Sequence, residues 1–269
     1  MDQKTKTEAF DALHRGAEIL ILPNAWDAAS AAVMADAGAK AVATSSAAVA
    51  WSHGYPDGDA LPLPLLLATI SAVARVVSAP VTADIEGGYT DDLGQLGETI
   101  KAVIGAGAVG INLEDGRRDP DLHARKIEAA RKAADATGVP LFINARTDVY
   151  LKGLAEGEAA YAETVQRAER YRAAGASGIF VPGPSDEDLT RRLAEAIKLP
   201  LNIMLLPGLA SAARLQALGV RRVSSATAPF RAAYATVAKA TAAFLRDGDP
   251  AAFAAGAEGL GNLNKRFEA

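Results

Sequence analysis

The feature of this sequence that most constrains its fold is a join that recurs seven times. An Ala-rich stretch stops at Gly or Pro, and a short apolar run follows within a few residues. Gly supplies the left-handed C-cap of a helix and Pro cannot continue one, so each join predicts a helix that leads into a strand. Seven joins connect eight strands. The joins lie at Gly38, Pro80, Gly107, Gly138, Gly175, Pro200 and Gly219.

Alternation of strands and helices predicts the architecture. Eight strand–helix units indicate a parallel sheet and favour its closure into an α/β fold of the (β/α)8 (TIM) barrel type. An open doubly wound sheet is the alternative, although no Gly-rich phosphate-binding turn follows the first strand, which continues as ILPNAWD. We predict strands near residues 19–22, 41–44, 81–85, 110–114, 141–145, 178–181, 201–204 and 222–224.

The chain length suits one barrel, so residues 1–269 are predicted to form a single domain with a helical extension at the C-terminal end. The segment from Asp249 onward is expected to dock on this subunit or on a neighbouring one. Two helix starts are visible: Asp119 as an N-cap followed by proline, and Ser185 with Asp188 as a capping box.

Charge and composition exclude several functional classes. With 28 basic and 32 acidic residues the net charge is −4, and no Lys/Arg-rich run is present, so nucleic acid is not an expected partner. The N-terminal segment has no apolar signal region and no run of about 18 apolar residues follows, which predicts a cytoplasmic protein without a membrane partner. The chain has no cysteine, which excludes disulfides, thiolate metal sites and a cysteine acid or nucleophile.

Polar residues gather where three neighbouring strands end, in the segments TADIEGG, GINLEDG and INARTD. The carboxyl ends of barrel strands form the active-site face, so these side chains are expected at one mouth. Side chains two residues apart on a strand share one side. The pairs and triplet in phase are Asp84 with Glu86, Asn112 with Glu114, and Asn144 with Arg146 and Asp148.

Clustered carboxylates in a poorly hydrated cavity repel one another unless a cation compensates them. Oxygen ligands without His or Cys indicate a hard ion, and a site with few direct carboxylates suits Mg²⁺, with Mn²⁺ as a substitute. Arg146 would then face the carboxylate or the developing oxyanion of a substrate. The alternative for any single acid is an N-cap or a partner of a nearby basic residue, and a third reading is a purely structural barrel with surface acids.

These motifs resemble the isocitrate lyase and phosphoenolpyruvate mutase superfamily over nearly the whole chain. The resemblance rests on LPNAWDAASA, TSSAAVAWSHGYPDG, VTADIEGGY, GINLEDG and FINARTD in this order, with weaker matches at GIFVPG and LNIM. It implies a (β/α)8 barrel whose last helix is exchanged between subunits of a homodimer or homotetramer. It also implies Mg²⁺ dependence and cleavage or formation of a C–C or P–C bond beside a 2-oxo or enol carboxylate.

Carried over by position, the resemblance implies a role for each of nine residues. Asp84 would be the direct metal ligand, while Asp57, Glu86 and Glu114 would hold metal-bound waters. The turn formed by Ser45, Ser46 and Ala47 would present backbone N–H groups and a hydroxyl to the substrate carboxylate. Arg146 would clamp the substrate, and Asn202 would contact its distal carboxylate. The groups expected to act in catalysis are Arg146, Asp57 and Glu114.

Departures from the superfamily pattern narrow the expected reaction. The cysteine-bearing lid of the isocitrate and methylisocitrate lyases is absent, and the longer gating loop of the phosphonate enzymes is also missing after LEDG. Decarboxylation or retro-aldol cleavage of an oxaloacetate-like acid is therefore the favoured hypothesis. A phosphonopyruvate-type mutase or hydrolase and a catalytically silent binder of 2-oxo or 2-hydroxy acids are the alternatives. His53, His123, Tyr89 or water would supply the proton that the enolate needs.

Overall fold

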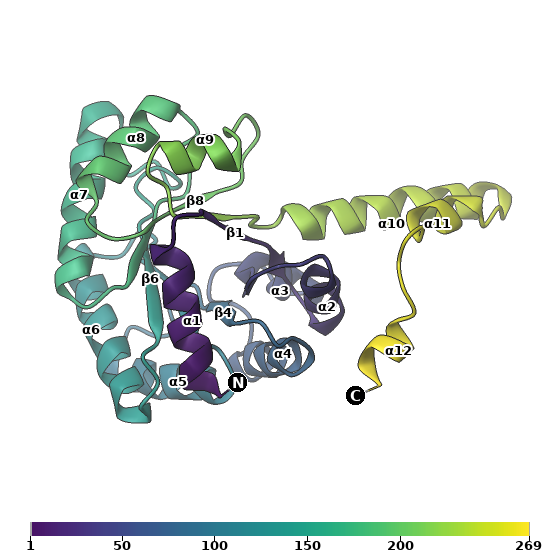
Figure 1. Cartoon of the computed structure of the whole chain (residues 1–269), viewed down its shortest axis with the longest axis horizontal. Helices are drawn as coiled ribbons and strands as arrows, with labels where there is room; N and C mark the ends of the chain where they lie inside the picture. The colour runs from purple at the N-terminus through teal and green to yellow at the C-terminus, as the bar shows by residue number, and fades with distance from the viewer. Residues whose placement is uncertain (1, 269) are drawn as a thin grey trace.

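The computed structural model describes residues 2–268, in which parallel strands form one sheet that closes on itself (Figure 1). The strand order is β1-β9-β8-β7-β6-β5-β4-β3-β2. The strands are β1 Leu20–Leu22, β2 Asn24–Ala25, β3 Val42–Thr44, β4 Val81–Asp84, β5 Gly110–Glu114, β6 Phe142–Arg146, β7 Gly178–Phe180, β8 Leu201–Met204 and β9 Arg222–Ser224.

Pro23 divides the first barrel strand into two short pieces, which explains why nine strands make an eight-position barrel. β1 pairs with β9 and β2 pairs with β3, so the two pieces join the ends of the sheet. Pro23 has no N–H to donate to the ladder, but its carbonyl still accepts the Ala43 N–H at 2.9 Å. The predicted (β/α)8 barrel is confirmed, and the predicted strands agree with the observed ones within two residues.

Helices cover the outer side of the barrel and extend beyond it. They are α1 Gln3–Arg15, α2 Ala28–Asp36, α3 Ser46–Ser52, α4 Leu63–Val76, α5 Leu93–Gly105, α6 Pro120–Thr137, α7 Gly157–Ala173, α8 Glu187–Ala196, α9 Ala212–Ala217, α10 Ala228–Asp247, α11 Ala251–Gly256 and α12 Leu263–Phe267.

α10 projects away from the barrel, and α11 folds back along α10 (Figure 1). The chain then returns, and Arg266 of α12 pairs with Asp36 of α2 at 2.9 Å and donates to the Val76 carbonyl at 3.1 Å. The C-terminal segment thus lies against α2 of its own barrel, with Arg266 forming the hydrogen bonds and Leu260 and Leu263 lining a cavity shared with Val33. No helix within residues 2–268 is long and apolar enough to cross a bilayer.

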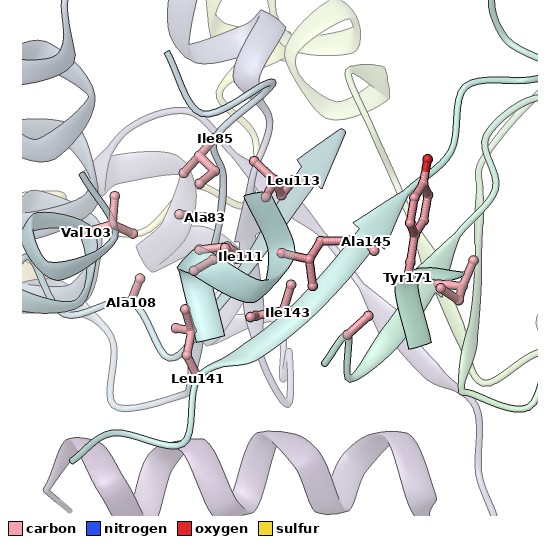
Figure 2. Close-up of a cluster of buried hydrophobic side chains, with 14 of the residues drawn as sticks. Ala83, Ile85, Val103, Ala108, Ile111, Leu113, Leu141, Ile143, Ala145 and Tyr171 are labelled. Atoms are coloured by element: carbon pink, nitrogen blue, oxygen red, sulfur yellow. The ribbon is translucent and has the colours of Figure 1, made fainter. Parts of the chain in front are cut away.

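Strand alternation separates an apolar outer layer from a polar interior. Ile111, Ile143 and Ala83 point outward into the core beneath the helices (Figure 2). Inside the barrel, the Asn144 amide donates to the side-chain oxygens of Asn112 and Asn202 at 2.9 and 3.0 Å. This layer of the interior is thus hydrogen-bonded across strands, and an apolar cluster that includes Leu20, Leu22 and Phe142 fills the interior at the other end of the strands.

Two local predictions have different outcomes at helix starts. Asp119 caps α6 and Pro120 is its first residue, as predicted. The prediction of a capping box at Ser185 is wrong, because Asp186 is the N-cap of α8 and accepts the Leu189 N–H at 2.8 Å. Asp, like Ser, is a preferred N-cap, so the sequence offered two adjacent candidates and only backbone geometry distinguishes them.

Candidate active site

Three consecutive strands deliver charged side chains to the mouth. Asp84 ends β4, Glu114 ends β5 and Arg146 ends β6, and the ladder sets Glu114 directly beside Arg146. All three side chains point into the barrel, because the alternate positions on these strands are packed under the helices. The strands therefore bring these predicted site residues together as the sequence indicated.

Arg146 is held by carboxylates on two sides. Its Nη1 lies 2.6 Å from Glu114, and its Nε lies 2.7 Å from Asp148, which also accepts from Nη2 at 3.3 Å. The guanidinium also lies over the ring of Phe180, 5.6 Å from the centroid. Burial opposes the charge, yet Glu114, Asp148 and Asp84 outweigh it and raise the pKa of Arg146, so this residue is a permanent cation in the mouth.

Asp84 is almost fully buried, and its backbone is tied to β3. Its N–H donates to the Thr44 hydroxyl at 2.9 Å, and its carboxylate accepts the Glu86 N–H at 3.3 Å. Burial raises the pKa of Asp84, with Arg146 opposing and Asp57 adding to the rise. An ionised carboxylate at this position therefore needs a positive charge near it.

β4 ends at Asp84, and Glu86 lies two residues beyond it in a turn. The two-residue repeat of a strand, which was used to align Glu86 with Asp84, therefore does not extend to Glu86. Its φ is 52°, which is the left-handed region. One carboxylate oxygen accepts the N–H groups of Gly58 and Asp59, and the other accepts the Tyr89 hydroxyl at 3.1 Å. Burial raises the pKa of Glu86 to about 7. The Glu86 carboxylate thus contacts the loop that carries Asp57.

The balance of charge at the mouth is strongly acidic. Burial raises the pKa of Glu114 to about 8, because Asp148, Asp84 and Asp57 add to the desolvation and outweigh Arg146. Arg146 faces these carboxylates across the mouth, and the buried Arg222 of β9 acts on Asp84 from the barrel interior. Within residues 2–268 no three His or acidic side chains form a closed metal cage. This donor set fits a hard cation with one direct carboxylate and several waters, and it does not fit a cage of protein ligands alone.

The serine turn and Asn202 occupy different depths. Ser45 is the N-cap of α3, and its own N–H is bonded to the Ala25 carbonyl at 3.1 Å. Ser46 follows as the first helical residue, and its N–H faces the Asp84 carboxylate, whose pKa it lowers. Ala47 is buried in the same first turn. Asn202 lies in the barrel interior, where it bonds to Asn144 and to Ser224, at 3.2 Å.

The candidate proton donors are unequal. His123 is fully buried and packs against Tyr171, with ring centroids 4.6 Å apart, so it cannot contact a substrate at the mouth in this structure. Burial lowers its pKa to about 3. His53 is exposed beyond α3 and lies 3.2 Å from the Thr69 hydroxyl. The Tyr89 hydroxyl donates to Glu86, so Tyr89 lies at the edge of the carboxylates of the mouth.

Sequence reasoning missed two residues that organise the mouth. Asp59 accepts the N–H groups of Gly87 and Tyr89 at 3.1 and 3.2 Å, and Arg118 donates to Asp59 at 2.8 Å. The second aspartate of GYPDGD and the second arginine of LEDGRRD were the available signals. Neither is in phase with a strand, so the alternation argument passed over them.

A parallel (β/α)8 barrel with acids and an arginine gathered at the carboxyl ends of its strands has the architecture of a TIM-barrel enzyme, whose active site lies at that face. A family model described as phosphoenolpyruvate phosphomutase matches residues 10–245. The chain belongs to this family and thus to the isocitrate lyase/phosphoenolpyruvate mutase superfamily of lyases and mutases, as the sequence motifs predicted.

Three relatives illustrate the range of the family. An uncharacterized protein of Mycobacterium tuberculosis is 36% identical over 245 residues, which cover 90% of each chain. An oxaloacetate decarboxylase of Chromohalobacter salexigens is 32% identical over 251 residues, covering 88% of this chain and 83% of its own. The crystal structure of a 2,3-dimethylmalate lyase superimposes with a TM-score of 0.83 at 25% identity, covering 91% of this chain and 89% of its own.

Proposed function

We propose that this protein is a Mg²⁺-dependent carbon–carbon lyase or decarboxylase that acts on an oxaloacetate-like 2-oxo dicarboxylic acid. The observation that carries the proposal is the convergence of Asp84, Glu114 and Arg146 from three consecutive strands, with carboxyl pKa values that stay raised although Arg146 and the buried Arg222 lie near. The named activities of the oxaloacetate decarboxylase and the dimethylmalate lyase support the same reaction class.

The residues at the mouth fit a hard divalent cation. Asp84 would be the direct ligand, and Asp57, Glu86 and Glu114 would hold its waters, with Mn²⁺ able to replace Mg²⁺. Mg²⁺ bound there would supply a Lewis acid beside the reacting 2-oxo group. The raised pKa values of Asp84 and Glu114 support this assignment, because a bound cation would stabilise the ionised carboxylates that burial, and then the neighbouring acids, disfavour.

Arg146 has donors left for a substrate. A guanidinium carries five N–H groups; Asp148 accepts one from Nε and one from Nη2, while Glu114 forms an ion pair with Nη1. The remaining N–H groups of Nη1 and Nη2 would bind a substrate carboxylate or the oxygen on which enolate charge develops. The two carboxylates hold the guanidinium in place, so little reorganisation is needed when that charge forms.

The substrate's own carboxylate would lie against the turn of Ser45, Ser46 and Ala47, where α3 begins. A helix start favours negative charge through its N–H groups. Loss of CO₂ from an oxaloacetate-like acid needs no general acid before the enolate forms, which agrees with the absence of cysteine. In this proposal Asn202 would reach the distal carboxylate only if its bonds to Asn144 and Ser224 rearrange.

The test is pyruvate release from oxaloacetate with and without Mg²⁺, corrected for the reaction that Mg²⁺ alone promotes. We expect Mg²⁺-dependent turnover by the wild type and a loss of about 100-fold or more in Asp84→Asn, which keeps the shape and removes the charge. Asp11→Asn, an exposed aspartate of α1 paired with Arg15, is the matched control. Absence of turnover in the wild type, or full turnover in Asp84→Asn, rules out the proposal.

Phosphonopyruvate is the second substrate to test, because the matching family model describes a phosphomutase. Phosphate release or phosphoenolpyruvate formation that exceeds oxaloacetate turnover would assign P–C bond chemistry instead. Calorimetric binding of 2-oxo acids in the presence of Mg²⁺, without any product, would assign a silent binding protein.

A further inference from the structure

Two segments at the mouth exchange hydrogen bonds in both directions. We name residues 54–60 the front loop and residues 85–89 the β4 turn. Glu86 of the β4 turn accepts the N–H groups of Gly58, at 2.6 Å, and Asp59. Asp59 of the front loop in return accepts the N–H groups of Gly87 and Tyr89. Each segment thus supplies a carboxylate for the backbone of the other.

The backbone in this contact is strained. Asp59, Glu86 and Tyr89 have φ values of 58°, 52° and 64°, and within residues 2–268 only one further non-glycine residue, Ala226, has a positive φ. Such conformations cost about 1 kcal/mol or more each and persist only where the surroundings hold them. The exchanged hydrogen bonds are the contacts that hold them here.

Arg118 locks this contact from a third segment, the short loop after β5. It donates to the second oxygen of Asp59 at 2.8 Å and to Asp91 at 2.9 Å. Its guanidinium lies so close to Gly87 that a Cβ added there would collide with it. The buried Lys126 supports the arrangement, because its ammonium donates to Asp91 at 2.7 Å.

The front loop needs such a lock because of the charge that it carries. Asp57 lies two residues before Asp59 in the sequence, and its negative charge acts on Asp84, Glu86 and Glu114. Like charges at this range repel, so the front loop would move away from the mouth unless other contacts retained it. The Arg118–Asp59 pair provides an attractive contact that does not occupy the acids of the mouth.

We propose that Arg118 is a positioning residue that holds the front loop on the β4 turn and thereby keeps Asp57 beside Asp84 and Glu114. Arg118, in the loop between β5 and α6, fastens the front loop in place. The catalytic consequence rests on the proposed function, whereas the locking of the front loop does not.

Hydrogen–deuterium exchange tests the lock directly on the protein without substrate. In Arg118→Met, peptides that contain residues 54–60 are expected to exchange at least about tenfold faster, because the N–H groups of Gly58 and Asp59 lose their protection. Arg117→Met is the matched control, since Arg117 is its exposed neighbour and donates only to the Lys152 carbonyl, at 3.0 Å. Unchanged exchange in Arg118→Met overturns the proposal.

A second variant separates the ion pair from general damage. Asp59→Asn keeps an oxygen for the Gly87 and Tyr89 N–H groups but loses its charge toward Arg118. If the pair is the lock, the double variant Asp59→Asn/Arg118→Met exchanges no faster than the faster single variant. Additive effects in the double variant would show that Arg118 and Asp59 act independently, which contradicts the proposal.

Steady-state kinetics with oxaloacetate and Mg²⁺ measure the catalytic consequence. Arg118→Met is expected to lower kcat/KM by about 10- to 100-fold and to raise the Mg²⁺ concentration needed for half-maximal rate, with a melting temperature close to that of the wild type. Arg118→Lys should recover part of the loss. Wild-type kinetics in Arg118→Met with fast loop exchange would refute the positioning role. An inactive wild type with fast loop exchange only in Arg118→Met would refute the proposed function and leave the lock intact.

Discussion

Arg146 lies between Glu114 and Asp148, which makes it sensitive to the shape of its side chain as well as to its charge. We expect Arg146→Lys to lower kcat/KM on oxaloacetate by about 100-fold, because an ammonium cannot contact both carboxylates and a substrate in one plane. Steady-state assays at saturating Mg²⁺ measure this change in kcat/KM. Arg117→Lys should match the wild type, and an Arg146→Lys enzyme within about twofold of the wild type would contradict the clamp.

Two buried histidines predict a loss of stability in acid. Burial lowers the pKa of His14 and His123 to about 3, well below the ordinary value of 6.5. Between these values the unfolded chain binds protons that the folded chain excludes. The contribution of these two histidines to stability is therefore complete above about pH 6.5 and is lost as the pH falls toward 3.

His123→Phe isolates one of these contributions. A phenyl ring can keep the packing against Tyr171 and cannot be protonated, so the melting temperature should depend less on pH between 6.5 and 4. The slope of the free energy of unfolding against pH should decrease by at most about 1.4 kcal/mol per pH unit. Thermal unfolding at several pH values measures it, and the double variant with His14→Phe should flatten the profile further. A slope equal to that of the wild type would exclude His123 as a source.

At the scale of the elements, α8 offers a direct comparison of two adjacent cap candidates. Asp186→Ala removes the acceptor of the Leu189 N–H and is expected to lower the free energy of unfolding by about 1 kcal/mol, or the melting temperature by about 2 °C. Ser185→Ala should change the free energy of unfolding by less than about 0.5 kcal/mol. If Ser185→Ala were instead the more destabilising of the two changes, Ser185 would be the N-cap of α8.

The strands and the three mouth residues were predictable because their signals are local. Gly or Pro marks each helix end, and the two-residue repeat aligns Asp84, Glu114 and Arg146 once the strands are placed. The Arg118–Asp59 pair could not be predicted, because it joins loops 59 residues apart and its geometry depends on left-handed residues. The division of the first strand at Pro23 likewise emerges only when both neighbours of that strand are known.

At the scale of the whole molecule, one position around the barrel has no helix over it. The outward residue of β1, Ile21, is 63% exposed, whereas Ile111 and Ile143 at equivalent positions are buried. An apolar groove that includes Leu205 and Leu209 runs beside it. The helix that follows the last strand, α10, projects away instead of covering β1, and it exposes its own apolar side chains, Tyr234, Val237, Phe244 and Leu245.

We propose that α10 of a second copy completes the barrel in a homodimer or homotetramer. Ile21→Asp would put a charge in the contact and is expected to shift the protein to monomer in sedimentation velocity at micromolar concentration. Leu151→Asp, at another exposed apolar residue, is the matched control and should sediment as the wild type does. A wild type that sediments as a monomer at every concentration would rule out the exchange.

The first turn of α10 also touches the mouth. Phe230 packs against Trp26 and Trp51 with ring centroids 5.3 and 5.6 Å apart, and Trp51 belongs to the same short helix as Ser46. A second copy bound along α10 would therefore be connected, through Phe230, to the helix that carries Ser46 of the candidate site. Dilution that separates the copies should consequently reduce the rate per enzyme molecule before it unfolds any of them.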